Sequence, residues 1–362
     1  MAPVLDNQER FWQGLLMAQK FSLRHPDMKI SLPLVLFAAG LGASALLAQP
    51  STNNPQSAIR NPQSQAVPGG TPATAGPDGI GTLRNPQSPP SRQRLPAGVT
   101  AVRDLEYGRA GAKVLHLDLY LPANSGKPLP LLVWIHGGAW RSGAKDGDVI
   151  PMLPLATNGY AMASVEYRLS QEAIFPAQIY DCKAAIRWLR ANAAKYNLDP
   201  GRFAAMGASA GGHLAALVGA SGGVAALEGD VNDLKQSSRV QAVVDWYGPS
   251  DLLQIGVPDS DIKHNDPGSP ESQLIGGALL EHKDKAAQAS PVTYVSKESP
   301  PFLIMHGDSD RSVPFNQSEL LLAALKKAGV DATLIPEKGI GHGFSGPQYL
   351  PPVREFLQRC LK

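Results

Sequence analysis

The residues most able to do chemistry form a widely spaced set that begins with a serine between small neighbours. Ser209 lies in Gly-Ala-Ser-Ala-Gly at 207–211, and a short apolar stretch precedes it at 202–206. A serine at a turn from strand to helix has strained backbone, so its flanking positions must be very small. The helix that follows would offer free N–H groups and a positive dipole to a developing oxyanion. We predict that Ser209 is a nucleophile.

Asp310 and His342 supply the other two groups of a nucleophilic relay. Asp310 lies in His-Gly-Asp-Ser-Asp-Arg-Ser-Val-Pro, which begins at 306, and His342 lies in Gly-His-Gly-Phe. Each motif follows an apolar run that is typical of a strand. The chain order serine, aspartate, histidine is the one found when the nucleophile stands on a strand-to-helix turn. We predict that His342 takes the proton of Ser209, and that Asp310 orients the imidazole and stabilises its cation.

A third motif, His-Gly-Gly-Ala-Trp at 136–140, follows the continuous apolar run 131–135. Small residues in such a loop allow backbone N–H groups to point at a substrate carbonyl oxygen. We predict that these groups form an oxyanion hole together with the N–H of Ala210. A glycine-rich turn without a catalytic role is the alternative. His136 is expected to hold the loop by a hydrogen bond rather than to exchange protons.

Other ionisable and aromatic residues near these motifs have simpler explanations. Asp308 and Asp245 are alternative acids, of which Asp308 is expected to shape its turn. The histidines at 213 and 306 are expected to pack or to form structural hydrogen bonds. Trp140 and Tyr247 lie beside the proposed pocket and are predicted to contact substrate, with core packing as the alternative.

Apolar runs that alternate with helical patterns place these motifs on an α/β scaffold. A mainly parallel central sheet flanked by helices on both faces is predicted from this alternation. The stretch 251–280 is polar and interrupted by glycine and proline, and is interpreted as a partial lid too short for a large cap domain. Strands are predicted at 102–107, 114–120, 131–135, 160–165, 202–206, 240–246, 302–305 and 332–335, and helices at 179–196, 210–220, 316–328 and 353–360.

These motifs, in this order, resemble the α/β-hydrolase fold. More narrowly, they resemble the esterases related to the hormone-sensitive-lipase group and to the bifunctional feruloyl/acetyl-xylan esterases, which the stretches 244–249 and 290–295 also match. The resemblance covers the chain from Val102 onward. It implies a triad of Ser209, Asp310 and His342. It further implies oxyanion donors at Gly138, Ala139 and Ala210, with Gly137 as a further candidate; Ala139 stands where the group usually has a third glycine.

The N-terminal third has the composition of targeting and linker segments. An apolar run at 30–48 follows Arg24 and Lys29 and contains the small-residue site Ala43-Ser44-Ala45. These are the three parts of a secretory signal peptide, which we predict at 28–48, with a retained membrane anchor as the alternative.

We interpret residues 1–27 as a non-native N-terminal extension, because Met28 begins a more compact signal. Residues 49–97 are rich in proline and repeat Asn-Pro-Gln-Ser, so we predict a disordered linker there. The catalytic domain is predicted at 98–362.

Charge and cysteine content exclude several classes of function. The 362 residues carry 33 Lys and Arg against 31 Asp and Glu, a formal net charge of +2. Nucleic-acid binding is therefore not expected, because it requires a strongly basic face. Cys182 and Cys360 are too few for a disulfide scaffold or a cysteine-rich metal site, although one disulfide between them stays open. The histidines form no paired metal motif, and we expect no metal and no cofactor.

We therefore predict a secreted or periplasmic serine hydrolase of carboxylic esters that acts on short acyl chains through an acyl-enzyme. Its partner would be a small-molecule or polysaccharide-linked ester, and no stable membrane insertion is expected after signal cleavage. Two alternatives within hydrolases stay open: an acetyl-xylan or feruloyl esterase on plant polysaccharide, and an amide or peptide hydrolase. A non-catalytic binding domain on this fold would be expected to lack part of the triad.

Overall fold

The computed structural model describes residues 94–123, 125–147, 151, 153–232, 235–344 and 346–362. The predicted signal peptide, the extension before it and nearly all of the predicted linker lie outside these residues. Within the described part of the chain, no helix is both long and apolar enough to cross a bilayer.

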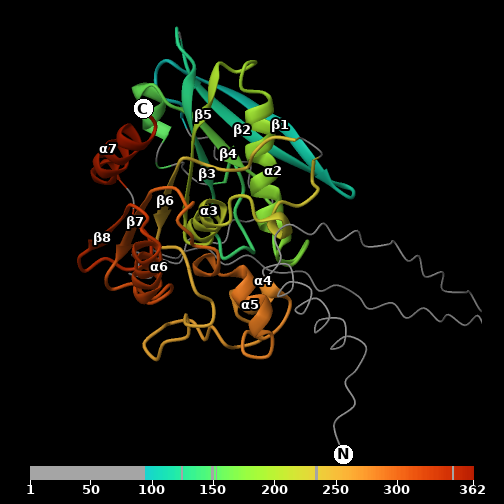
Figure 1. The fold of residues 1–362 in the computed structure, drawn as a ribbon, viewed down its shortest axis with the longest axis vertical. Coiled ribbons are helices and arrows are strands. Elements are labelled where there is room, and N and C mark those ends of the chain that lie inside the picture. Colours follow the sequence, from blue (N-terminus) through green and yellow to red (C-terminus); the bar gives the residue numbers. More distant parts are fainter. Residues whose placement is uncertain (1–93, 124, 148–150, 152, 233–234, 345) are drawn as a thin grey trace, which may run out of the picture. The chain divides into compact units, whose positions relative to one another are not determined.

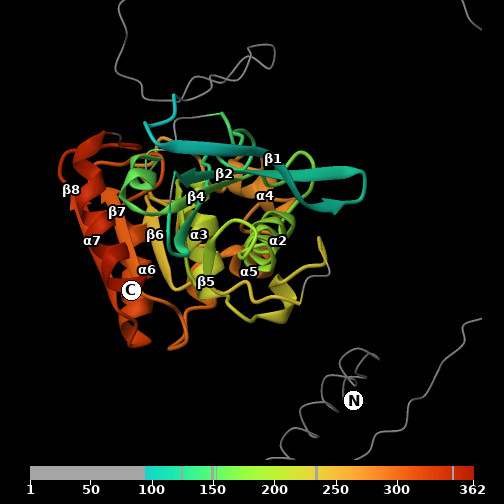
Figure 2. The same ribbon diagram turned by 90° about the horizontal axis from the view of Figure 1, so that it is seen from above.

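An eight-stranded sheet organises the described residues (Figure 1). Its strand order is β1-β2-β4-β3-β5-β6-β7-β8. Strand β2 pairs antiparallel with both of its neighbours, and every other pair is parallel. Figure 2 shows β1 and β2 at one side of the sheet and β8 with α7 at the other. The strands are β1 (Val99–Ala110), β2 (Lys113–Pro122), β3 (Leu129–Ile135), β4 (Ala161–Val165), β5 (Leu198–Ala208), β6 (Ala242–Trp246), β7 (Phe302–Gly307) and β8 (Ala332–Glu337).

Side chains of the buried strands alternate between two separate apolar layers. In β3, Leu131, Val133 and Ile135 join one layer, whereas Leu132 and Trp134 join the other. This is the period-2 alternation of a strand that is covered on both faces, and it explains the unbroken apolar run seen in the sequence.

Helices complete both layers. The first layer includes residues of α2 (Ala177–Ala191), α3 (Ala210–Ala220) and α6 (Asn316–Lys327), and the second includes residues of α7 (Leu350–Cys360). The predicted α/β architecture with helices on both faces is thereby confirmed. The helix predicted at 179–196 ends earlier, at Ala191, because a turn at 192–197 leads into β5.

Two short helices in the β6–β7 connection were not predicted. They are α4 (Pro270–Ile275) and α5 (Lys283–Ala289). Ser269 caps α4 by accepting a hydrogen bond from the Ser272 N–H at 3.1 Å. Short 3-10 helices lie at Leu153–Asn158, Ala225–Leu227, Pro291–Thr293 and Pro347–Tyr349. The connection is a compact insertion rather than a separate cap.

Candidate active site

Ser209 occupies the sharp turn between β5 and α3. Its backbone has φ 55° and ψ −122°, which is unusual for any residue other than glycine. A Cβ at Gly207 would overlap with the backbone of Gly211, and a Cβ at Gly211 would overlap with the carbonyl of Ile135. Both glycines are therefore required for the strand and the helix to approach this closely. The Ser209 N–H donates to the carbonyl of Trp246 at 2.8 Å, which ties the turn to β6.

The structure brings together the three side chains of the predicted relay. His342 Nε2 lies 3.0 Å from Ser209 Oγ, and His342 Nδ1 lies 2.7 Å from Asp310 Oδ2. The three residues follow β5, β7 and β8, so they meet at the carboxyl edge of the parallel strands, where ligands bind in open α/β sheets. In this geometry the imidazole can accept the serine proton while the carboxylate holds its other nitrogen.

Asp310 is buried, and donors surround its carboxylate. Its Oδ1 accepts hydrogen bonds from the N–H groups of Ser312 at 2.8 Å and Val313 at 2.9 Å. Burial alone would raise the pKa of Asp310, but hydrogen bonds from His306 and His342 together with the Val313 N–H hold that pKa well below its usual value. Asp310 is therefore a fixed negative charge beside His342.

The loop after β3 is held in an unusual conformation that leaves two of its N–H groups without a carbonyl partner among the described residues. Gly138, Ala139 and Trp140 all have positive φ, at 107°, 54° and 56°. Within the described residues, the N–H groups of Gly138 and Ala139 donate to no carbonyl, and the N–H of Ala210 lies in the first turn of α3, which has no intrahelical partner. Gly137 packs so closely on the Ala208 carbonyl that a Cβ there would clash. Gly137 thus lies beside the Ser209 turn, and Gly138 and Ala139 follow it directly in the chain.

The buried side chain of Trp140 anchors this loop to the interior of the domain. It is only 1% exposed, and its Nε1–H donates to His213 Nδ1 at 3.2 Å. His213 Nε2 in turn lies 2.7 Å from the Ala289 carbonyl, and burial lowers the pKa of His213 to about 4. Neutral His213 therefore links the loop to α3 and to the end of α5. The structure favours packing over the substrate contact that we expected for Trp140.

Tyr247 packs against the imidazole of His342. Its ring is 8% exposed and meets the His342 ring edge-on at 5.0 Å between centroids. Burial raises the pKa of Tyr247 far above that of a free phenol, so the ring stays neutral. The side chain is placed to hold His342 in its orientation, and it offers little surface to a substrate.

The alternative acids do not reach His342. Asp308 Oδ1 accepts from the Gly339 N–H at 2.7 Å and so shapes its turn, as expected. Asp245 Oδ1 accepts from the Gly248 N–H at 3.0 Å, and its Oδ2 has no hydrogen-bond partner within the described residues. Complete burial raises the pKa of Asp245 to about 7.

The open disulfide alternative is wrong. Cys182 and Cys360 are free thiols in the structure, and Cys182 is buried. Within the described residues, no cluster of three or more His, Cys, Asp or Glu side chains is arranged to hold a metal ion.

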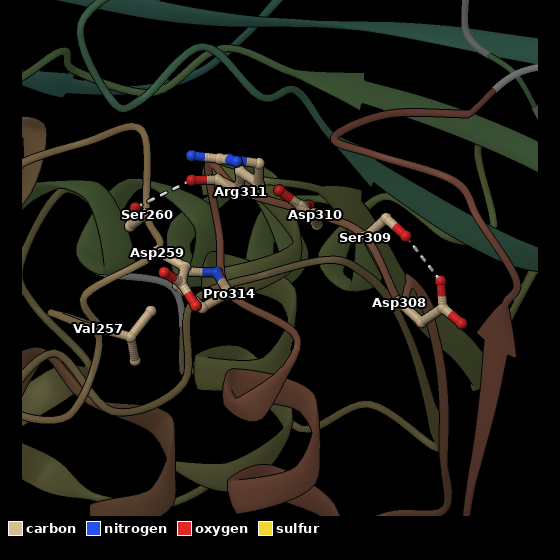
Figure 3. A pocket seen from close by; sticks show the side chains of 8 residues that line it. All are labelled: Val257, Asp259, Ser260, Asp308, Ser309, Asp310, Arg311 and Pro314. Atoms are coloured by element: carbon tan, nitrogen blue, oxygen red, sulfur yellow. Dashed lines mark hydrogen bonds between the residues drawn. The ribbon is translucent and has the colours of Figure 1, made fainter.

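A cavity of about 270 Å³ lies beside the loop that carries Asp310 (Figure 3). Val257, Asp259 and Ser260 of the β6–β7 connection line it on one side, and residues 308–311 with Pro314 line it on the other. Ser260 Oγ donates to the Arg311 carbonyl at 2.9 Å, and the Arg311 guanidinium pairs with Asp261 at 2.9 Å. The connection is therefore docked on the loop that carries Asp310.

The same connection contains a second set of a hydroxyl, an imidazole and a carboxylate in sequence, as in Ser209, His342 and Asp310. We call each such set a row. Ser260 Oγ lies 3.0 Å from His264 Nε2, and His264 Nδ1 lies 3.0 Å from Glu271 Oε1. The second distance is that of an ion pair, but Nδ1 of His264 is not aligned for a hydrogen bond. The lack of alignment means that His264 and Glu271 form no hydrogen bond, because a hydrogen bond weakens steeply with angle.

Two of these contacts were missed from the sequence. The hydrogen bond between Trp140 and His213 joins residues 73 positions apart, and no local pattern announces it. The contact of His306 with Asp310 has a sequence signal, since the two residues are four positions apart around a strand end.

Known proteins are similar to this chain over the part that contains the strands and the site described above. A family model described as BD-FAE matches residues 117–325. Esterase LipQ of Mycobacterium tuberculosis is 32% identical over 252 residues, which is 69% of this chain and 58% of LipQ. The chain spans 54% to 60% of the length of the first three curated relatives that it matches.

Two solved structures resemble the chain over most of their own length. A truncated carbohydrate esterase from gut microbiota is 37% identical with a TM-score of 0.66, over 72% of this chain and 95% of that one. Esterase 2 of Thermogutta terrifontis, solved with propionate bound, is 27% identical with a TM-score of 0.57, over 73% and 92%. These matches confirm the α/β-hydrolase fold that the motifs predicted.

Proposed function

We propose a specific reaction for this chain, which belongs to the BD-FAE family of α/β-hydrolase esterases and whose described domain is of the carboxylesterase type. The reaction is the hydrolysis of short-chain carboxylic esters by Ser209, His342 and Asp310 through an acyl-enzyme. The observation that carries the proposal is the unbroken row of contacts, 3.0 Å from Ser209 Oγ to His342 Nε2 and 2.7 Å from His342 Nδ1 to Asp310 Oδ2.

In the first half of the reaction, Ser209 Oγ attacks the ester carbonyl carbon while His342 Nε2 takes the hydroxyl proton. The carbonyl oxygen becomes an oxyanion, which the N–H groups of Gly138, Ala139 and Ala210 stabilise. Asp310 stays ionised because its pKa is lowered, so it stabilises the imidazolium that forms. When the tetrahedral intermediate collapses, the bond to the alcohol oxygen breaks and that oxygen takes the proton from His342.

In the second half, a water molecule attacks the acyl-enzyme. His342 Nε2 takes one proton from the water, and the resulting hydroxyl adds to the acyl carbon. The bond to Ser209 Oγ then breaks, the serine recovers its proton from His342, and the carboxylic acid leaves. The same donors hold the oxyanion in both halves.

The preference for small esters is supported by the oxyanion loop and by a relative. Ala139 places a methyl group where a third glycine would leave space, so bulky and tertiary alcohols are expected to react slowly. The Thermogutta esterase was solved with propionate bound, and propionate is a short carboxylate. The similarity to the gut carbohydrate esterase supports a second candidate substrate, an ester carried on a polysaccharide. Acetylated xylan is an example of such an ester.

A panel of substrates tests the proposal. We expect kcat/KM to be highest for p-nitrophenyl acetate to butyrate and to fall for longer chains, with a p-nitroanilide of the same acyl group far slower. Acetylated xylan tests whether a polysaccharide-linked alcohol is accepted, and methyl ferulate tests whether an aromatic acyl group is accepted. Mass spectrometry of a quenched reaction should find the acyl group on the peptide with Ser209. Faster turnover of the anilide, or an acyl group elsewhere, would contradict it.

We further propose that the chain is exported. The support is the basic residues Arg24 and Lys29 before the apolar run 30–48 and the small-residue site at 43–45 near the end of that run. Mature protein from the periplasm or medium should begin after Ala45 or Ala48, whereas protein retained in the cytoplasm with Met28 intact would refute the proposal.

A further inference from the structure

A second imidazole shares the carboxylate oxygen that holds His342. His306 is the residue before the last one of β7 and is completely buried. Its Nε2 lies 3.2 Å from Asp310 Oδ2 and 2.9 Å from the Val313 carbonyl, and its Nδ1 lies 2.7 Å from Ser318 Oγ. Asp310 Oδ2 therefore stands between two histidine rings.

The partners of His306 determine where its proton lies. Nε2 faces two groups that can only accept, the ionised Asp310 and a backbone carbonyl, so Nε2 must carry hydrogen. Nδ1 faces a hydroxyl, which can donate, so a neutral ring with the proton on Nε2 satisfies all three partners. Ser318, on the first turn of α6, thus selects this arrangement by donating to Nδ1.

We propose that His306 is a positioning residue that holds Asp310 and limits how strongly Asp310 attracts the proton of His342. The proposal rests on the function proposed above and extends it to a residue that contacts neither substrate nor Ser209. A carboxylate oxygen that already accepts from His306 has less charge to offer to His342. Without His306, Asp310 would hold the His342 cation more firmly, and the base would release its proton less readily.

Other groups that face His306 do not compete for this role. The neutral ring of Tyr247 lies 6.3 Å from the His306 ring, and Phe315 lies 5.5 Å from it. His342 faces the same carboxylate from the β8 side. Among the described residues, Asp310 and His342 are therefore the titratable groups through which a change at His306 would act.

The test compares His306→Leu, which removes the donor, with His306→Gln, which keeps an N–H near the position of Nε2. In His306→Leu the acid limb of the kcat/KM profile should move to higher pH by about one unit, because one charge-assisted hydrogen bond is of the order of tenfold in an equilibrium. His306→Gln should shift it less. His264→Leu is the matched control: it removes another buried imidazole beside a carboxylate, and its acid limb should coincide with that of the unmodified protein.

A second variant keeps the proposal testable if His306→Leu does not fold. Ser318→Ala removes one buried oxygen and should shift the limb in the same direction by a smaller amount. If Ser209→Ala is inactive but all His306 and Ser318 variants that fold keep the original acid limb, the positioning role is refuted and the triad stands. If Ser209→Ala retains full activity, the proposed function itself fails.

Discussion

Among the rows of serine, imidazole and carboxylate in the described part of the molecule, two have nearly the same distances. Ser209, His342 and Asp310 stand at the ends of three parallel strands, whereas Ser260, His264 and Glu271 lie within one connection. Each row places its serine 3.0 Å from an imidazole nitrogen. The distance alone therefore does not distinguish a catalytic arrangement from a structural one.

The surroundings of the two rows differ. Asp310 is aligned with its imidazole and receives two backbone N–H donors, while Nδ1 of His264 is not aligned with Glu271. Ser209 stands on a turn beside free amide groups, but Ser260 donates to the Arg311 carbonyl and so helps to dock the connection. Catalysis requires a prepared site for the oxyanion as well as a base, and we assign only the first row to catalysis.

Exchange of Ser209 and of Ser260 for alanine should show the largest difference between the two rows. Ser209→Ala should lower kcat by about 10⁴- to 10⁶-fold, the order seen when the nucleophile of a serine hydrolase is removed. Ser260→Ala should leave kcat and KM unchanged. Ester hydrolysis measured on both proteins, with circular dichroism to verify folding, gives the answer. Equal losses would mean that the second row takes part.

Exchange of the two carboxylates has the next largest effect. Asp310→Asn should lower kcat by about 10⁴-fold, because an amide favours the wrong tautomer of the histidine. Glu271→Gln should keep kcat and change only the melting temperature. Steady-state kinetics beside thermal unfolding separates the two outcomes, and a large loss of kcat in Glu271→Gln would refute our assignment of the second row.

Acidification should lower the activity without lowering the melting temperature, and this effect is smaller than those of the substitutions above. Activity should fall by about tenfold per pH unit on the acid side of neutrality, since the base must be an uncharged imidazole. The melting temperature should stay nearly level down to about pH 4.5, because two buried groups act in opposite directions.

The signs follow from burial. The pKa of His213 is lowered to about 4, so its contribution to stability is lost as the pH falls from about 6.5 toward 4. The pKa of Asp245 is raised to about 7, so folding gains stability as the pH falls from 7 toward 4. Asp310, with its lowered pKa, costs stability only below about pH 4. Parallel loss of activity and melting temperature between pH 7 and 5 would contradict this account.

The sequence predicted the elements that carry strong local patterns. The continuous apolar run at 131–135 and the glycines around Ser209 are consequences of burial on two faces and of close backbone approach, so both are visible without coordinates. Contacts that depend on the tertiary fold were out of reach. Trp140 looked like a pocket residue because it follows the oxyanion loop, and only the position of His213 on α3 shows that its indole turns inward.

The short helix α4 was missed for a related reason. Its six residues carry too few apolar positions to show a helical period, and its boundaries are set by the Ser269 cap and by Gly276 in a left-handed conformation. His306 was expected to be structural, which is correct in that it is buried. Its contact with Asp310 depends on the conformation of the loop after β7, which no local sequence pattern specifies.

The backbone of Ser209 has a consequence for how this protein can change over evolutionary time. A residue with a side chain held at φ 55° stores strain of about 1–3 kcal/mol, which glycine would not carry. Selection for thermal resilience alone would therefore favour glycine at the position where the reactive hydroxyl stands. The serine persists only while its chemistry is needed, so a lineage freed from that demand should lose its nucleophile early and become more robust in doing so.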